Sequence, residues 1–282
     1  MISAHTRLLG LIGDPVGQSV SPAMHNAALQ ALGLDCVYLA FRVTAPSLIQ
    51  AVGGLRALDA GGFNVTIPHK VKILPLLDEL APEAAAIGAV NTIVNRDGRL
   101  VGYNTDAGGF RAALRKYDVD PAGMTAVLIG AGGAARAIAF ALVSQKASLT
   151  ILARRPEAAL DLVLRLKAGA GQVEARELTR ANLEAALGRG DLVINATSVG
   201  MTPDSDRTPV PGDLLRAGMT VFDAVYHPQQ TRLLREAETA GAAVIGGLEM
   251  LVAQAALSFE LWTGQKAPLE IMARAGQEAL ER

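Results

Sequence analysis

The most informative segment of this chain is Thr125-Ala126-Val127-Leu128-Ile129-Gly130-Ala131-Gly132-Gly133-Ala134-Ala135, which leads into a helix-like stretch at 136–143. An apolar strand, a glycine turn and a helix start, in this order, can hold a dinucleotide pyrophosphate on free backbone N–H groups at the positive end of a helix dipole. We expect Gly130 to make the turn and Gly132 to admit the phosphates, with Ala135 at an allowed third position. An ordinary glycine turn without a ligand is the alternative.

The residues after the next apolar run indicate which dinucleotide binds. The run at 148–153 ends where an Asp or Glu, about twenty residues beyond the glycine turn, would hydrogen-bond the ribose 2′-hydroxyl of NAD. Arg154 and Arg155 stand there instead, and guanidinium groups suit a 2′-phosphate by charge and by fork geometry. The sequence therefore predicts NADP as the cofactor, with a solvated arginine pair on a surface turn as the alternative.

Length and composition fit two modest α/β domains, since the chain has 282 residues, 50% hydrophobic content and 29 glycines. A net charge of −1 without a basic run argues against nucleic acid or an anionic membrane as partner, so we expect a small-molecule ligand. Cys36 is the only cysteine and the histidines show no metal spacing, so we expect neither an internal disulfide nor a metal site. We expect a cytoplasmic protein, because signal-peptide and membrane-spanning patterns are missing.

Strand-like and helix-like segments alternate in both halves of the chain, which indicates parallel βαβ units. In the first half the expected strands are 8–12, 36–43 and 63–67, with helices after Pro22 and Pro46, and a hairpin of 89–94 and 100–103 around Asp97-Gly98. In the second half the expected strands are 125–129, 148–153, 192–196, 221–224 and 244–245. The stretch 250–262 is apolar on most faces and predicts a buried helix, packed between the domains or back onto the first.

The expected fold is therefore α/β, with two domains. The first is an N-terminal α/β substrate domain with a mainly parallel sheet, formed by residues 1–105 and 248–282. The second is a Rossmann-like, doubly wound NADP-binding domain formed by residues 106–247. The C-terminal helices are expected to return to the first domain.

Lys70 and Asp106 are the candidate catalytic pair. Lys70 follows Pro68, and we expect a strand to end and a helix to open here, which places Lys70 in a first helical turn. The helix dipole disfavours a cation at that place, so a proton carrier explains Lys70 better than a structural role, although an ordinary solvated lysine is the alternative. Asp106 stands at another predicted helix start, where helix capping alone could account for it. Beside Lys70 it would hold the amine in place.

Further polar residues lie in apolar or helix-start settings. Ser19 and Ser21 flank Val20 before Pro22, and alternate residues of an extended segment point the same way. Helix capping is the alternative for both serines. Asn91, Thr92, Tyr226 and Gln254 are polar groups among apolar neighbours, and each could instead satisfy a buried backbone group.

Together these segments resemble the shikimate dehydrogenase family, NADP-dependent enzymes of aromatic amino-acid and chorismate biosynthesis, over nearly the whole chain. The resemblance implies that Ser19 and Ser21 hold the substrate carboxylate and that Lys70 is catalytic with Asp106 as its partner. The other substrate contacts that it implies are Asn64, Thr66, Asn91, Tyr226 and Gln254. The cofactor contacts that it implies are Gly130, Ala131, Gly132, Gly133, Ala134, Ala135, Arg154, Arg155, Thr197, Ala224 and Gly247, the last two near the nicotinamide.

Two positions depart from the family pattern. The family usually has Asn-Arg-Thr and a further basic residue where this chain has Ala153-Arg154-Arg155 and Ala158, so Arg155 would have to replace the missing charge. Glu249 stands where glycine is common. The activity implied is reversible reduction of 3-dehydroshikimate to shikimate by NADPH, in a monomer or homodimer.

The nearest alternatives are a quinate/shikimate dehydrogenase and an aminoshikimate paralogue, which share this chemistry but differ in the ring substituents of their substrates. A non-catalytic NADP(H)-sensing module is the alternative from another class of protein. Such a module would keep the glycine turn but need neither Lys70 nor Asp106.

Overall fold

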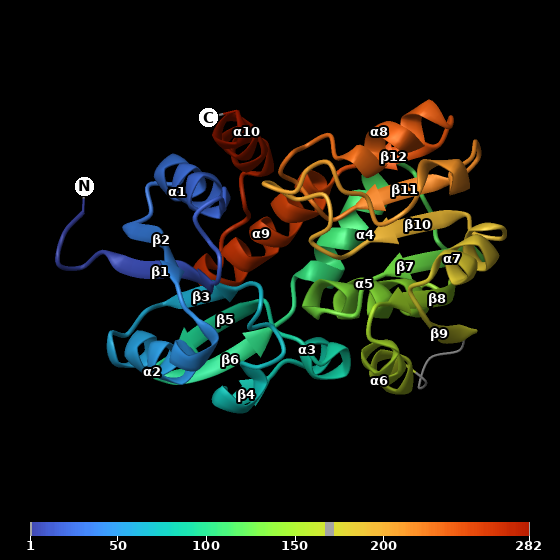
Figure 1. Cartoon of the computed structure of the whole chain (residues 1–282). Helices are drawn as coiled ribbons and strands as arrows, with labels where there is room; N and C mark the ends of the chain where they lie inside the picture. Colours follow the sequence, from blue (N-terminus) through green and yellow to red (C-terminus); the bar gives the residue numbers. More distant parts are fainter. Residues whose placement is uncertain (1, 167–171, 282) are drawn as a thin grey trace. The chain divides into compact units, whose positions relative to one another are not determined.

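A computed structural model describes residues 2–166 and 172–281 of the chain (Figure 1). The chain forms two compact units, one comprising Met1–Gly109 with Val252–Arg282 and the other Phe110–Leu251. Both crossings between the units lie inside helices, α4 (Asp106–Lys116) and α9 (Gly247–Thr263). No helix in the described part of the chain is both long and apolar enough to cross a membrane.

The first unit is built on a mixed sheet with the strand order β2-β1-β3-β5-β6-β4. Its strands are β1 (Arg7–Gly13), β2 (Cys36–Arg42), β3 (Gly62–Val65), β4 (Glu79–Leu80), β5 (Thr92–Arg96) and β6 (Arg99–Tyr103). Strands β2, β1 and β3 are parallel, β5 is antiparallel to β3 and β6, and β4 runs parallel to β6. The predicted hairpin is confirmed, because Asp97 and Gly98 both have the positive φ of a tight two-residue turn.

Helices and short 3₁₀ turns complete the first unit. They are α1 (Ser21–Ala31), η1 (Ala45–Ser47), α2 (Leu48–Ala57), η2 (Leu74–Leu76), α3 (Pro82–Ile87), the C-terminal part of α9, and α10 (Leu269–Leu280). One core cluster includes Ile12, Phe63, Val65, Ile93 and Leu100. Helix α10 packs against α1, so the C-terminal segment does return to the first unit.

The second unit is a parallel sheet in the order β12-β11-β10-β7-β8-β9. Its strands are β7 (Thr125–Ile129), β8 (Ser148–Ala153), β9 (Val173–Glu177), β10 (Leu192–Asn195), β11 (Thr220–Asp223) and β12 (Ala243–Ile245). Strands β7 and β8 have the predicted bounds. The chain leaves β7 for β8 and β9 and later returns on the other side of β7, so the carboxyl ends of β7 and β10 flank the switch point where such sheets bind ligands.

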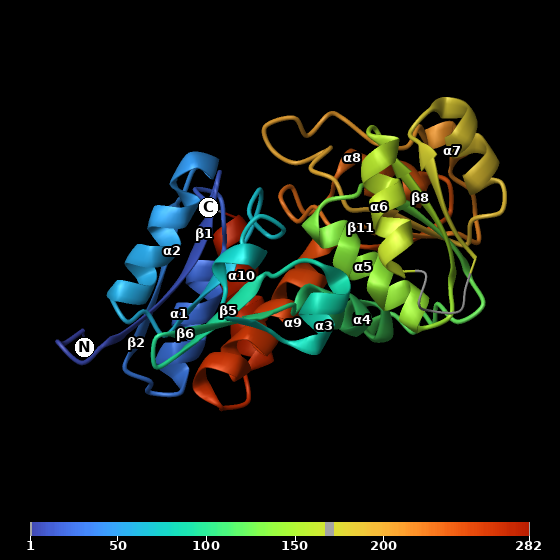
Figure 2. The same ribbon diagram turned by 90° about the horizontal axis from the view of Figure 1, so that it is seen from below.

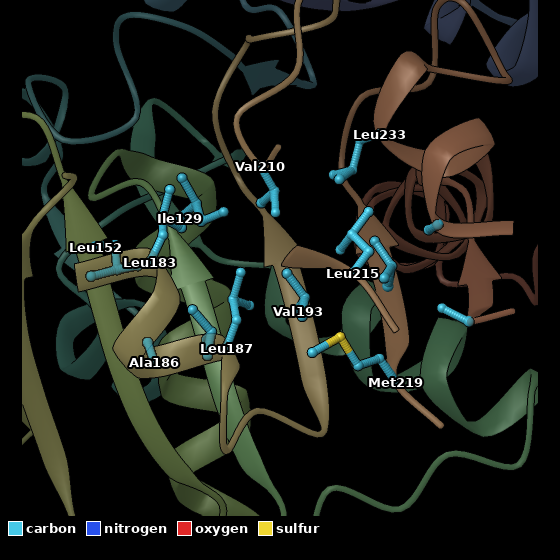
Figure 3. Packing of buried hydrophobic residues seen from close by; sticks show 14 of the residues in the cluster. Ile129, Leu152, Leu183, Ala186, Leu187, Val193, Val210, Leu215, Met219 and Leu233 are labelled. Atoms are coloured by element: carbon cyan, nitrogen blue, oxygen red, sulfur yellow. The ribbon is translucent and has the colours of Figure 1, made fainter. Parts of the chain in front are cut away.

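Helices α5 (Gly133–Ser144), α6 (Pro156–Leu166), α7 (Arg180–Leu187) and α8 (Arg232–Thr239), with η3 (Gly212–Leu214), complete the second unit. Helices α5 and α6 lie side by side (Figure 2). Leu187 of α7 and Leu233 of α8 belong to one buried cluster with Ile129 of β7 and Val193 of β10 (Figure 3). Apolar residues of the strands and of the inward faces of the helices therefore form the core that holds the glycine turn in place. The predicted doubly wound fold is confirmed.

The predicted helix after Pro68 is wrong, because residues 67–73 form successive turns that lead into η2. The carbonyl of Lys70 accepts a hydrogen bond from the Val90 N–H at 2.8 Å, so it is not used in a helical ladder. The N–H of His69 closes a tighter turn onto the Thr66 carbonyl at 2.9 Å. Lys70 is therefore not in the first turn of a helix, and the dipole argument for its role does not apply.

The expectation of an extended Ser19–Ser21 segment is also wrong. Val20 has helical backbone angles, and Ser21 is the first residue of α1. The Ser21 N–H donates to the Ser19 hydroxyl oxygen at 3.3 Å. The two serines are thus arranged as a helix start.

Candidate active site

Lys70 and Asp106 form an ion pair in the first unit, with 2.5 Å between Lys70 Nζ and Asp106 Oδ2. Their side chains are 15% and 5% exposed, so both charges are largely removed from water. Asn91 Nδ2 donates to the other carboxylate oxygen, Oδ1, at 2.8 Å. The carboxylate is thus fixed on both oxygens and holds the ammonium group in one place, which is the geometry that a proton-transferring lysine requires.

Asn91 connects this pair to helix α9. Its Nδ2 also lies 3.1 Å from Gln254 Oε1 on α9, and its Oδ1 accepts from the Thr105 N–H at 2.7 Å. Thr105 directly precedes Asp106, so this contact fixes the start of α4. Asn91 therefore joins Thr105 and Asp106 to Gln254 of α9, beside the lysine–aspartate pair.

Asn64, at the carboxyl half of β3, belongs to the same buried network. Its Nδ2 lies 3.1 Å from the Asn91 carbonyl and 3.1 Å from Ser258 Oγ. Its Oδ1 accepts from the Tyr38 hydroxyl at 2.7 Å. Asn64 is only 6% exposed, so these contacts set the orientation of its amide.

Thr66 and the serine pair lie apart from that network in the described hydrogen bonds. Thr66 follows β3 and is half-buried, and a Cβ on Gly13 would come within 2.3 Å of its methyl group. Ser21 is buried and Ser19 half-buried at the start of α1. Within residues 2–166 and 172–281, no hydrogen bond joins Ser19, Ser21 or Thr66 to Lys70 or Asp106.

The glycine turn of the second unit has the geometry that a phosphate site needs. Gly130 has φ 117°, and a Cβ there would approach the Ala196 carbonyl at 3.0 Å, so only glycine fits. Gly132 is the N-cap of α5, and no side chain caps the first N–H groups of that helix. The position of a Cβ on Gly132 has no atom within 4 Å. Donors and open space thus occur together at a helix N-terminus, as anion binding requires.

The other residues predicted to bind the pyrophosphate or the 2′-phosphate lie beside this turn or after β8. Ala131 lies between the glycines, and Gly133, Ala134 and Ala135 form the first turn of α5. Arg154 and Arg155 are exposed after β8, and neither has an ion-pair partner in the described part of the chain. These residues fit a dinucleotide with a 2′-phosphate.

A second buried network lies at the carboxyl ends of β10 and β11. Asp223 accepts from Asn195 Nδ2 at 2.9 Å, from the Val225 N–H at 3.0 Å and from the Thr231 hydroxyl at 2.7 Å. Asn195 Oδ1 accepts in turn from the Thr197 hydroxyl at 2.7 Å. Burial raises the pKa of Asp223 to about 6, although the three hydrogen bonds oppose that rise.

This network orders the loops that carry the other predicted cofactor residues. Thr197 follows β10 and Ala224 follows β11, each within two residues of a network member. Gly247 opens α9, and a Cβ there would meet the Ala224 carbonyl at 2.5 Å, which explains the glycine. Tyr226 is half-buried in the same loop as Ala224, and it belongs to the second unit, unlike the other predicted substrate-binding residues.

Glu249, the departure from the family pattern, has a structural explanation. Both of its carboxylate oxygens lie 2.8 Å from Lys116 Nζ. Glu249 stands in the first turn of α9 and Lys116 in the last turn of α4, where the helix dipoles favour a negative and a positive charge respectively. The extra carboxylate is therefore neutralised by a neighbour.

Sequence reasoning missed several residues of the two networks. They are Tyr38, Thr105, Asn195, Asp223, Thr231 and Ser258. A signal existed for Asn195 and Asp223, because each is a polar residue that ends an apolar strand on the ligand side of a parallel sheet. In the described part of the chain, no group of three or more His, Cys, Asp or Glu side chains could hold a metal ion.

The fold and these groups define a two-domain, NADP-dependent oxidoreductase. Family models match at residues 11–93 (shikimate dehydrogenase substrate binding domain), 112–202 (shikimate / quinate 5-dehydrogenase) and 247–275 (shikimate 5'-dehydrogenase C-terminal domain). A shikimate dehydrogenase (NADP(+)) of Moorella thermoacetica is 49% identical, over 99% of this chain and 95% of that protein. The chain belongs to the shikimate dehydrogenase family.

Other relatives agree. A shikimate dehydrogenase (NADP(+)) of Methanosarcina mazei is 47% identical, over 98% of this chain and 99% of its own length. The crystal structure of shikimate 5-dehydrogenase from Thermus thermophilus, in complex with NADP(H) and shikimate, has a TM-score of 0.87 and 38% identity, covering 97% of this chain and 99% of that one. A shikimate dehydrogenase structure in complex with NADP+ has a TM-score of 0.92 and 40% identity, covering 100% of this chain and 98% of that one. The resemblance inferred from the sequence is thereby confirmed.

Proposed function

We propose that this chain catalyses the reversible, NADP-dependent interconversion of 3-dehydroshikimate and shikimate, working in the cell towards shikimate for chorismate and aromatic amino acids. The observation that carries the proposal is the buried Lys70–Asp106 pair, anchored by Asn91, in a chain of this family. A non-catalytic NADP(H)-sensing module has no use for such a pair. Removing two charges from water costs free energy that their pairing only partly offsets, so stability alone explains the pair poorly.

In this proposal Lys70 moves the proton and Asp106 orients it. The bound nicotinamide supplies or takes up the hydride. During reduction, the Lys70 ammonium gives its proton to the substrate oxygen as negative charge develops there, and during oxidation the amine accepts it back. Asp106 keeps Lys70 in place and accepts a hydrogen bond from a neighbouring substrate hydroxyl.

We assign the other contacts by combining the family pattern with the placement of each residue. Ser19 and Ser21 hold the substrate carboxylate, and the remaining substrate contacts are Asn64, Thr66, Asn91, Tyr226 and Gln254. Gly130 to Ala135 hold the pyrophosphate and Arg154 with Arg155 the 2′-phosphate. Thr197, Ala224 and Gly247 are further cofactor contacts, with Ala224 and Gly247 near the nicotinamide.

We further propose that residues 1–105 with 248–282 act as the substrate domain and 106–247 as the cofactor domain. The two compact units support this division, with crossings about four residues later in each case. We also propose a cytoplasmic enzyme that works as a monomer or homodimer, since each chain carries both sets of residues.

The experiment is an assay of the purified chain with shikimate or quinate as substrate and NADP or NAD as cofactor. Reduction of the nicotinamide is monitored in all four combinations. Shikimate with NADP should give the highest kcat/KM. A higher kcat/KM for quinate would instead identify the chain as a quinate/shikimate dehydrogenase. Binding of NADP without turnover of either acid would favour the sensing module.

A further inference from the structure

Tyr38 is a fully buried residue of β2 whose hydroxyl contacts a residue of the proposed substrate site. Its hydroxyl lies 2.7 Å from Asn64 Oδ1, and the residue is 0% exposed. Tyr38 lies 26 positions before Asn64, and β1 pairs with both of their strands in the sheet. The contact therefore joins the edge strand of the sheet to the site.

Aromatic neighbours fix the ring of Tyr38. The His25 ring stacks on it with 4.3 Å between centroids and 14° between planes, and the Trp262 ring is tilted against it at 5.9 Å. Burial lowers the pKa of His25 to about 3, so His25 is neutral near neutral pH and packs as an uncharged ring. Trp262 is itself fixed by a hydrogen bond from its Nε1 to the Ile93 carbonyl at 2.8 Å.

The direction of the Tyr38–Asn64 hydrogen bond follows from the other side of the Asn64 amide. The Asn91 backbone carbonyl, 3.1 Å from Asn64 Nδ2, can only accept, so the NH₂ group must face it. Ser258 Oγ lies 3.1 Å from the same nitrogen. Oδ1 is consequently the atom that faces Tyr38, and the tyrosine hydroxyl is the donor.

We propose that Tyr38 is a positioning residue for substrate recognition, which fixes the amide of Asn64 in the single orientation that the substrate meets. The inference rests on the proposed function, in which Asn64 contacts the substrate. Without the hydroxyl, Asn64 Oδ1 loses its buried donor, and the amide is held only through the contacts of its Nδ2, so it can shift from its position. The effect should fall on the binding of shikimate rather than on proton transfer, because Lys70 and Asp106 lie at the other end of the network.

The test is Tyr38→Phe, which keeps the ring and its stacking and removes only the hydroxyl. The KM for shikimate should rise roughly 2- to 10-fold, as expected for one hydrogen bond. The kcat and the KM for NADP should change by less than about twofold. Tyr117→Phe is the matched control, since Tyr117 is 44% exposed and lies outside the site. An unchanged shikimate KM in Tyr38→Phe would overturn the inference.

Action through Asn64 is tested in an Asn64→Ala background, where Tyr38→Phe should leave the shikimate KM unaltered. A further increase there would show that Tyr38 acts by another route and would overturn the inference. The NMR signals of the Asn64 side-chain amide, assigned by their loss in Asn64→Ala, report on the contact without any substrate. They should shift in Tyr38→Phe and not in Tyr117→Phe. If they shift while the wild type turns over no shikimate, the proposed function fails and the positioning contact stands; if they do not shift, the contact fails.

Discussion

Lys70 takes its place from contacts that are distant in sequence. Its charge is paired with Asp106 at 2.5 Å, and its own carbonyl is bound by the Val90 N–H. Neither partner adjoins it along the chain. If Lys70 is the proton carrier, as we propose, these contacts hold its ammonium group in one place before the substrate binds, which is the condition for general acid catalysis.

Lys70→Ala should therefore lower kcat by roughly 10²- to 10⁴-fold and change the KM for shikimate much less. Steady-state kinetics with shikimate and NADP measure both values. Lys72→Ala is the matched control, because Lys72 is an exposed lysine in the same turn region. A Lys70→Ala variant with a near wild-type kcat would remove Lys70 from the chemistry.

Arg154 is the residue that we expect to give the chain a higher affinity for NADP than for NAD. It is exposed after β8, and no ion pair competes for it in the described part of the chain. Arg154→Ser should weaken NADP binding by about 1.5–3 kcal/mol and NAD binding very little, because only NADP offers the 2′-phosphate. Titration of the variant with each cofactor measures this, and equal losses for both would show that Arg154 does not read the 2′-phosphate.

Much of the candidate site could be predicted from individual residues. The other residues of the site could not be predicted, and the reason is physical. Asn91 and Gln254 stand out as polar groups among apolar neighbours. Lys70 was singled out by a helix-dipole argument that does not hold in the structure, and Asp106 stands at a helix start that suits it. Tyr38 and Ser258 fit their strand and helix without difficulty. Their contacts with Asn64 arise only when distant segments pack, and no local pattern records such contacts.

At the scale of elements, strands and the glycine turn could be predicted because each depends on its own residues. The apolar run 125–129 is a strand, and Gly130 is required by its positive φ. The segment after Pro68 could not be predicted in this way. The carbonyls of Ile67 and Lys70 accept hydrogen bonds from the N–H groups of Asp14 and Val90, and tertiary contacts of this kind override local helix signals.

The network at the ends of β10 and β11 should make stability depend on pH. The folded pKa of Asp223, about 6, lies above its ordinary value of 3.8, so folding favours the neutral carboxyl. That contribution is complete below pH 3.8 and is lost as the pH rises through about 6. The free energy of unfolding of the wild type, relative to Asp223→Asn, should fall by on the order of 3 kcal/mol between about pH 4 and about pH 7.

Urea denaturation of both proteins across this pH range gives the difference directly. Titrations elsewhere in the chain cancel, because they are common to the two proteins. If this difference in the free energy of unfolding does not vary with pH, the folded protein accommodates the neutral and the charged carboxyl of Asp223 equally well.

At the scale of the whole molecule, the proposed function assigns different parts of the reaction to the two units. The first holds the Lys70–Asp106 pair and the serines, and the second holds the glycine turn and the arginines. The chain crosses between them only inside α4 and α9, and Asp106 is the first residue of α4. One connecting helix thus begins with a residue of the proposed proton-transfer pair.

The most direct test of the proposed activity is the ratio of kcat/KM for shikimate to that for quinate, both with NADP. In the proposed function the hydroxyls of Ser19 and Ser21 bind the carboxylate of an acid with an unsaturated ring, which leaves no partner for the extra ring hydroxyl of quinate. Excluding an added hydroxyl is worth about 10²-fold. We expect shikimate to exceed quinate by at least that order, and Ser21→Thr or Ser21→Gly to narrow the gap. Comparable wild-type values for the two acids would contradict the assignment and identify a quinate/shikimate dehydrogenase instead.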